Sequence, residues 1–133
     1  MSYLLFASDL YLIGLALTVA LVVYPSFHLV GDEQWSSFHR AHVRRMVFAV
    51  APAWFAQCIG SLWWLVFGPC RGCATANAAI ALVAIGVTIA GAIPAHHRLE
   101  RRHDSGDIQC LQMWHWLRTG AWIGCALVTL RML

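Results

Sequence analysis

Four long apolar stretches constrain this chain more than any other feature. A bilayer hydrocarbon core about 30 Å thick needs roughly 20 consecutive apolar residues to cross it as an α-helix. Four stretches reach that length, at residues 3–27, 46–67, 74–94 and 111–133. Little chain remains between them, so we expect a single all-α domain over residues 1–133. The predicted fold is an integral membrane four-helix bundle.

Composition favours the same class of protein. Of the 133 residues, 60% are hydrophobic and 11% are charged, whereas soluble domains carry about 25% charged residues. The net charge is only +3, and all nine basic residues are arginine. A positive balance this small does not indicate nucleic-acid binding. The predicted partner is the lipid bilayer.

The arginines predict how the chain is oriented. Segments 28–45 and 95–110 lie on the same side of a four-span protein and hold three arginines each. Basic residues are enriched in cytoplasmic loops. We therefore expect these two segments in the cytoplasm and both termini outside, in a bacterial inner membrane. Segment 32–45 has a helical pattern and is predicted to continue the second span as an interfacial stem, and Pro52 is expected to kink that span.

Histidines gather at the predicted cytoplasmic face. All seven lie there, and they come from all four spans: His28, His39, His42, His96, His97, His103 and His115. His39 and His42 share a helix face at spacing i, i+3. His115 and Arg118 share a face of the fourth span in the same way. A bundle that turns these faces inward would bring several imidazoles together.

Such a cluster favours a cofactor or catalytic site, because neutral imidazole binds zinc, copper, iron and haem iron. The predicted metal and cofactor ligands are His39, His42, His97 and His115. Arg118 and His115 are the predicted catalytic residues, since ionisable groups inside a membrane bundle tend to be functional or paired. The alternative is that these side chains reach toward lipid headgroups, as Arg and His commonly do. We assign His28, His96 and His103 to that role.

Two further polar features lie near the opposite face. Cys70 and Cys73 flank a short turn on the predicted outer side, which is oxidising in a bacterium, so a structural disulfide is expected. A redox pair is the alternative interpretation of this C-x-x-C motif. Asp9 and Arg131 are predicted to form an ion pair that closes the bundle.

Four short motifs carry a resemblance to a known family. They read YPSF at 24–27, FHRAHVRRM at 38–46, PAHHRL at 94–99 and HWLRT at 115–119. In these motifs the chain resembles uncharacterised bacterial four-span membrane proteins similar to the anthrone oxygenase-like family. Members carry a proline and a polar residue after the third span, where Asn is commoner than His97, and a Trp/Asn/His…Arg element in the fourth.

Two functions from different classes follow. The first is a membrane oxidoreductase or oxygenase-like enzyme that acts on a lipophilic small molecule at the His/Arg site, with a metal ion or haem or by acid–base chemistry. The second is a non-catalytic accessory subunit of a larger membrane complex or homo-oligomer. The small residues of the third span favour the second function, because they let helices approach closely in lipid.

Overall fold

Helices account for nearly the whole chain in the computed structural model, which describes residues 1–133 and contains no strand. Two short π-helical segments, η1 and η2, continue the α-helices without a break. The elements are α1 (Ser2–Thr18), η1 (Val19–Val23), α2 (Tyr24–Phe27), α3 (Asp32–Phe67), α4 (Arg71–Val87), η2 (Thr88–Ala92), α5 (Ile93–Arg101) and α6 (Ser105–Leu130). They form four continuous rods. We call residues 2–27 the first rod and residues 71–101 the third rod.

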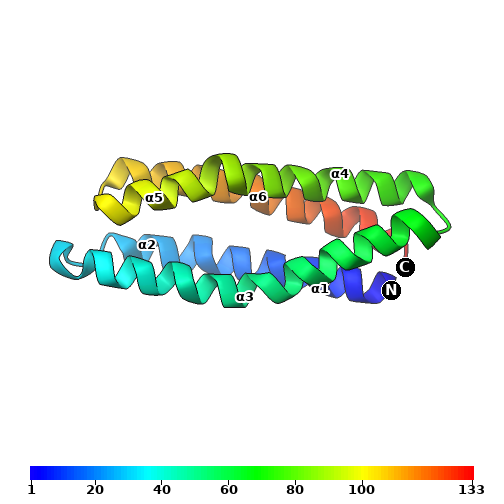
Figure 1. The fold of residues 1–133 in the computed structure, drawn as a ribbon, viewed down its shortest axis with the longest axis horizontal. Helices are drawn as coiled ribbons and strands as arrows, with labels where there is room; N and C mark the ends of the chain where they lie inside the picture. Colours follow the sequence, from blue (N-terminus) through cyan, green and yellow to red (C-terminus); the bar gives the residue numbers. More distant parts are fainter.

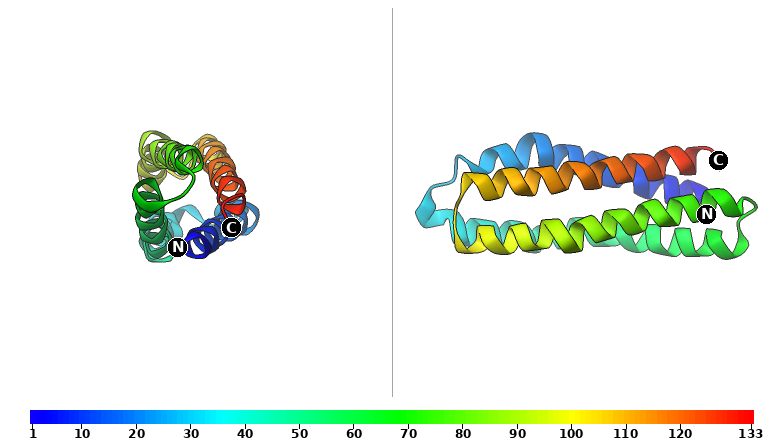
Figure 2. Two further views of the ribbon diagram at one scale, coloured as in Figure 1. Left: turned by 90° about the vertical axis from the view of Figure 1, so that its right-hand side faces the viewer. Right: turned by 90° about the horizontal axis from the view of Figure 1, so that it is seen from above.

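The four rods form an elongated bundle with a square cross-section (Figures 1 and 2). Each rod has two neighbours, because α3 and α6 both pack against the first rod and against the third rod. Both termini and the turn at 68–70 lie at one end of the bundle, and the loops at 28–31 and 102–104 lie at the other (Figure 1). The second end carries segments 28–45 and 95–110, and we call it the His/Arg end.

Three of the four rods are long and apolar enough to span a membrane. They are Ser2–Phe27, Asp32–Phe67 and Arg71–Arg101, with mean hydropathies of 2.1, 1.4 and 2.2 over their most apolar windows. The fourth predicted span corresponds to α6, which does not reach the same hydropathy. Three of its polar side chains, those of His115, Thr119 and Thr129, are buried in the bundle. The outer face of α6 is apolar, with Leu117 and Leu127 exposed.

The predicted stem is part of α3. That helix has 36 residues, so at ~1.5 Å per residue it is about 54 Å long, well beyond a ~30 Å hydrocarbon core. Asp32 and Glu33 occupy its first turn, where acidic side chains interact favourably with the helix dipole. Pro52 lies within α3 without ending it, and α3 curves toward α4 over its second half (Figure 1).

Both π-helical segments precede a proline. Pro25 is the second residue of α2, after η1, and Pro94 is the second residue of α5, after η2. A proline inside a helix lacks an N–H donor, and its ring clashes with the carbonyl four residues earlier. The wider π turn, with its i→i+5 bonds, lets the rod continue past the proline. Both segments pack against α6, and Thr88 of η2 accepts a hydrogen bond from Arg118.

Candidate functional site

A cavity of about 270 Å³ lies between the rods, toward the His/Arg end. Residues from all four rods line it. The polar ones are Tyr24, His42, Thr88, His96 and Arg118, and the apolar ones are Val19, Val43, Met46, Val47, Val50, Ala51, Trp54 and Ile93. We call it the His/Arg cavity. Its lining includes two exposed side chains, Val47 of α3 and Ile93 of α5, so it opens sideways between these helices.

Arg118 supplies the fixed positive charge of the cavity. Its Nη1 donates a hydrogen bond to Thr88 Oγ1 at 3.4 Å, and its Nη2 donates to His115 Nδ1 at 3.0 Å. No carboxylate forms an ion pair with this guanidinium. The cation is therefore held in place by neutral acceptors, and its charge is left for a ligand that carries a negative oxygen.

His115 orients Arg118. The imidazole is 1% exposed, and its Nε2 lies 2.8 Å from the backbone oxygen of Ala16. Because Arg118 can only donate, His115 Nδ1 accepts and Nε2 carries the proton toward Ala16. The ring edge of Tyr24 packs against the imidazole, with centroids 5.0 Å apart. Both ring nitrogens are occupied, so His115 positions the guanidinium and has no nitrogen free for a metal or a substrate.

Three other imidazoles meet at the end of the cavity. His39 Nε2 lies 3.1 Å from His96 Nδ1, and the ring centroids of His42 and His96 are 6.3 Å apart. The Phe27 ring packs edge-on against His39 and His42. α3 and α5 therefore bring together a group of three histidines, of which His42 and His96 line the cavity.

Burial keeps these imidazoles neutral. Desolvation, followed by the nearby positive charge of His39, lowers the pKa of His42 to about 4. The same causes, with His42 and Arg118 adding to them, lower the pKa of His96 to about 3. A neutral imidazole has one nitrogen that accepts a proton. At neutral pH the cavity therefore combines two proton acceptors with one permanent cation.

The structure corrects the predicted ligand set. His39, His42, His97 and His115 do not form one group, and no three His, Cys, Asp or Glu side chains are placed to hold a metal ion. His97 is exposed, whereas its neighbour His96 lies in the cavity. Adjacent helical residues point about 100° apart, so His96 faces the His/Arg cavity and His97 does not. The residue pattern did not indicate which one, and the π turn of η2 just before it alters the helix phase.

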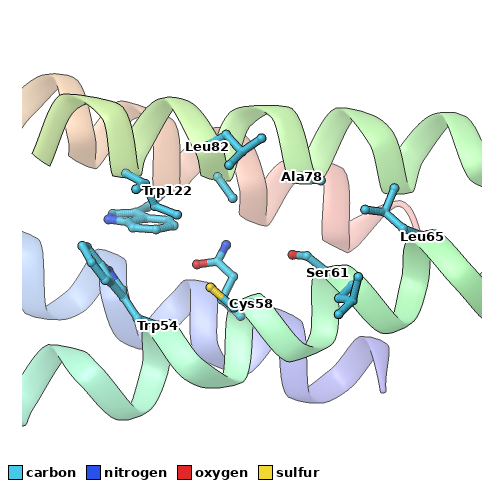
Figure 3. A pocket seen from close by; sticks show the side chains of 11 residues that line it. Trp54, Cys58, Ser61, Leu65, Ala78, Leu82 and Trp122 are labelled. Carbon is cyan, nitrogen blue, oxygen red and sulfur yellow. The ribbon is translucent and has the colours of Figure 1, made fainter. Parts of the chain in front are cut away.

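Two further pockets continue the cavity along the seam between α3 and the third rod. Toward the His/Arg end, a polar pocket of about 330 Å³ is lined by His39, Arg40, Val43, Arg44, His96, His97 and Glu100. Toward the termini, an apolar pocket of about 230 Å³ lies between α3 and α4 (Figure 3). His96 belongs to both the polar pocket and the His/Arg cavity, and Trp54 belongs to both the cavity and the apolar pocket. Polarity therefore decreases along the seam from the His/Arg end.

His103 closes the His/Arg end of the bundle. Its Nδ1 lies 2.8 Å from Asp32 Oδ1 and its Nε2 lies 2.9 Å from the backbone oxygen of Phe27. Its ring stacks on Trp35 with centroids 4.0 Å apart, and Trp35 Nε1 donates to the backbone oxygen of Leu99 at 2.6 Å. His103 therefore links the two loops of this end and does not take part in the cavity.

At the opposite end, Cys70 and Cys73 form a disulfide at the start of α4. The predicted pair of Asp9 with Arg131 is wrong. Asp9 is fully buried, accepts a hydrogen bond from Gln57 and shares another with Thr129, while Arg131 is exposed at the end of α6. The pairing failed because Asp9 lies two turns inside the bundle, where neutral side chains of other helices reach it first.

Sequence reasoning missed Tyr24 and Thr88 as cavity residues. Tyr24 stands next to Pro25, and Thr88 begins the π turn that precedes Pro94, so a polar residue near a proline in an apolar span was the available signal.

Comparison with protein-family models, with curated proteins and with solved structures finds no match to this chain.

Proposed function

We propose that this protein is a four-span enzyme of a bacterial inner membrane that acts, in the manner of an oxygenase, on a lipophilic substrate. The observation that carries the proposal is the His/Arg cavity, which combines an unpaired guanidinium, two neutral imidazoles and apolar walls. In this proposal the His/Arg end faces the cytoplasm and both termini face outward. The resemblance to the anthrone oxygenase-like family supports the same assignment.

The outer surface of the bundle supports membrane insertion of all four rods. Large apolar side chains are exposed along each rod, for example Leu21, Phe48, Leu82 and Leu127. Soluble monomers rarely expose contiguous apolar surface on this scale. Within α6, His115, Thr119 and Thr129 are buried and Arg118 lines the His/Arg cavity, so α6 can lie in lipid as the other three rods do.

The cavity suits proton abstraction next to a carbonyl group. A neutral imidazole of His42 or His96 takes a proton from an acidic C–H bond of the substrate. The charge moves to the carbonyl oxygen, where Arg118 stabilises it in a site shielded from water. For anthrone, the resulting anion reacts with dioxygen, and one anthrone plus one O₂ gives one anthraquinone plus one water. The ring carbon is oxidised, O₂ is reduced, and the proton held by the imidazole leaves in the water.

Anthrone is therefore the probe for the first experiment. The purified protein in detergent should accelerate anthraquinone formation and O₂ uptake above the rate of detergent alone. Arg118→Leu should lower the rate by about 10²–10³-fold, the usual cost of removing one donor to a developing oxyanion. One of the two variants His42→Ala and His96→Ala, the one that lacks the base, should lower the rate by about 10²-fold or more.

Arg131→Leu is the matched control, because Arg131 is an exposed arginine at the far end of the same helix. Its activity should equal that of the wild type. An Arg118→Leu variant that folds, shown by an unchanged unfolding temperature, and still oxidises anthrone at the wild-type rate would overturn the assignment of the site. A wild-type protein that gives no acceleration would overturn the oxygenase proposal.

A further inference from the structure

A second buried polar site lies outside the His/Arg cavity, toward the end that holds the termini. Its centre is Asp9, which is 0% exposed and lies inside the apolar rod Ser2–Phe27. Gln57 Nε2 donates to Asp9 Oδ1 at 2.7 Å, and Thr129 Oγ1 lies 2.8 Å from Asp9 Oδ2. No arginine or histidine pairs with this carboxyl.

All four rods contribute to the network around Asp9. Asn77 of α4 donates from Nδ2 to Thr129 Oγ1 at 3.0 Å, and its Oδ1 accepts from Ser61 of α3 at 3.0 Å. These partners are neutral amides and hydroxyls. The only other titratable group is the thiol of Cys125 on α6, which lies 3.7 Å from the backbone oxygen of Asn77. An ionised Asp9 would be an uncompensated charge inside the bundle, where no opposite charge offsets the loss of its hydration.

The contacts of Thr129 indicate where a proton must be. Its hydroxyl oxygen lies 2.8 Å from Asp9 Oδ2, 2.9 Å from the backbone oxygen of Cys125 and 3.0 Å from Asn77 Nδ2. A hydroxyl has one proton to donate and accepts two. The carbonyl of Cys125 can only accept, and the amide of Asn77 donates. All three contacts become hydrogen bonds only when Asp9 Oδ2 carries a proton and donates it to Thr129, whose own proton goes to Cys125.

We infer that Asp9 is an intramembrane proton-binding site, occupied by a proton at neutral pH. This inference rests on the hydrogen-bond geometry and on burial in an apolar span, and it does not depend on the reaction proposed for the His/Arg cavity. A neutral Asp9 leaves no unpaired charge in the network and keeps the bond from Gln57 to the carbonyl oxygen. The bundle thus holds a dissociable proton where its four rods meet.

Infrared spectroscopy tests this in the intact protein, reconstituted in lipid vesicles at pH 7. The carbonyl stretch of a protonated carboxylic acid should be present in the wild type and absent in Asp9→Asn. Incorporation of aspartate with a ¹³C side-chain carboxyl should shift that band. Because the other three aspartates (Asp32, Asp104 and Asp107) lie outside the buried core, a single shifted band belongs to Asp9.

The carbodiimide dicyclohexylcarbodiimide gives an independent readout, because it enters lipid and reacts with protonated carboxyls. The carboxyl proton moves to one carbodiimide nitrogen, the carboxyl oxygen adds to the central carbon, and an oxygen-to-nitrogen acyl shift gives a stable N-acylurea without a leaving group. Mass spectrometry should find one adduct, mapped to Asp9. The control Asp107→Asn should keep the adduct, and Asp9→Asn should lose it.

The labelled wild type keeps the inference testable even if Asp9→Asn does not fold. A wild-type spectrum without a ¹³C-sensitive protonated carboxyl band, together with no adduct at Asp9, would show that Asp9 is ionised and would overturn the inference. Loss of anthrone oxidation has no bearing on it, since Asp9 contributes nothing to the lining of the His/Arg cavity.

Discussion

The imidazoles of the His/Arg cavity make the stability of the bundle depend on pH. Folding holds the pKa of His42 at about 4 and that of His96 at about 3, whereas each is about 6.5 in the unfolded chain. Between these values the unfolded chain binds protons that the folded chain does not bind. The free energy of unfolding therefore rises with pH across this window and levels off above pH 6.5.

The expected result is a bundle that loses stability as the pH falls from 6.5 toward 4. Thermal unfolding in detergent, followed by circular dichroism from pH 7.5 to 4.5, measures this loss. His42→Gln should flatten the curve by removing one of the buried groups. The control His28→Gln should leave it unchanged, because His28 is exposed. If the unfolding temperature depends on pH in the same way in all three proteins, burial does not lower the pKa values of these imidazoles.

At the residue scale, the sequence correctly predicted those features that depend only on where a residue lies along the chain. The gathering of histidines at one end follows from the order of the spans, and three of them do meet in His39, His42 and His96. The choice between His96 and His97 depends on helix rotation, which a single sequence does not provide. The network of Asp9, Gln57 and Asn77 was missed, although an amide side chain inside an apolar span was a visible sign that it needed a partner.

At the scale of elements, the two π-helical segments explain how rods with internal prolines stay continuous. Pro25 and Pro94 each lie inside a rod, and the structure accommodates both with wider turns at Val19–Val23 and Thr88–Ala92. Hydrophobic patterns do not distinguish a π turn from an α turn, so this detail could not be predicted. The consequence for the site is direct, because Thr88 in η2 holds Arg118.

η2 also packs closely against α6, and glycine substitutions test that contact. A Cβ atom added at Gly91 in η2 would overlap the ring of Trp114, whereas one added at Gly86 in α4 would meet no atom. Gly91→Ala should therefore destabilise the bundle, by about 1–3 kcal/mol, the usual cost of overpacking. Gly86→Ala should be neutral or stabilising by up to about 1 kcal/mol, because alanine is the better helix former.

Unfolding by sodium dodecyl sulfate in mixed micelles compares these two variants. The pair is matched, since both changes add one methyl group to the same rod. Equal stability of Gly91→Ala and the wild type would show that Trp114 can move aside without cost.

At the scale of the whole molecule, the pattern of apolar stretches was sufficient to predict an all-helical bundle. The stretches form four rods because a helix pairs all backbone N–H and C=O groups within the segment. Long apolar runs separated by short polar segments have few other ways to form these hydrogen bonds. The pattern could not predict which rods pack tightly against each other and which leave pockets between them, because that depends on the rotation of each helix about its axis. The pockets between α3 and the third rod follow from that packing. The accessory-subunit alternative stays a prediction.

Orientation in the membrane is a prediction at this same scale. A C-terminal fusion to alkaline phosphatase should be active in cells, because the enzyme works only outside the cytoplasm, and a fusion after Arg102, which keeps all six arginines of the two segments, should be inactive. Both outcomes follow from the arginines of segments 28–45 and 95–110 being retained inside. The reverse pattern would place the His/Arg end outside the cell.

The sideways opening of the His/Arg cavity, between Val47 and Ile93, determines which solvent supplies the ligand. In the proposed orientation that opening faces acyl chains. The ligand concentration that governs binding is therefore the concentration of the ligand in the lipid. A compound that partitions a hundredfold into the bilayer gains about 2.8 kcal/mol of apparent affinity before it makes a single contact. Substrates would then be selected first by their solubility in the membrane and second by how well they fit the shape of the cavity.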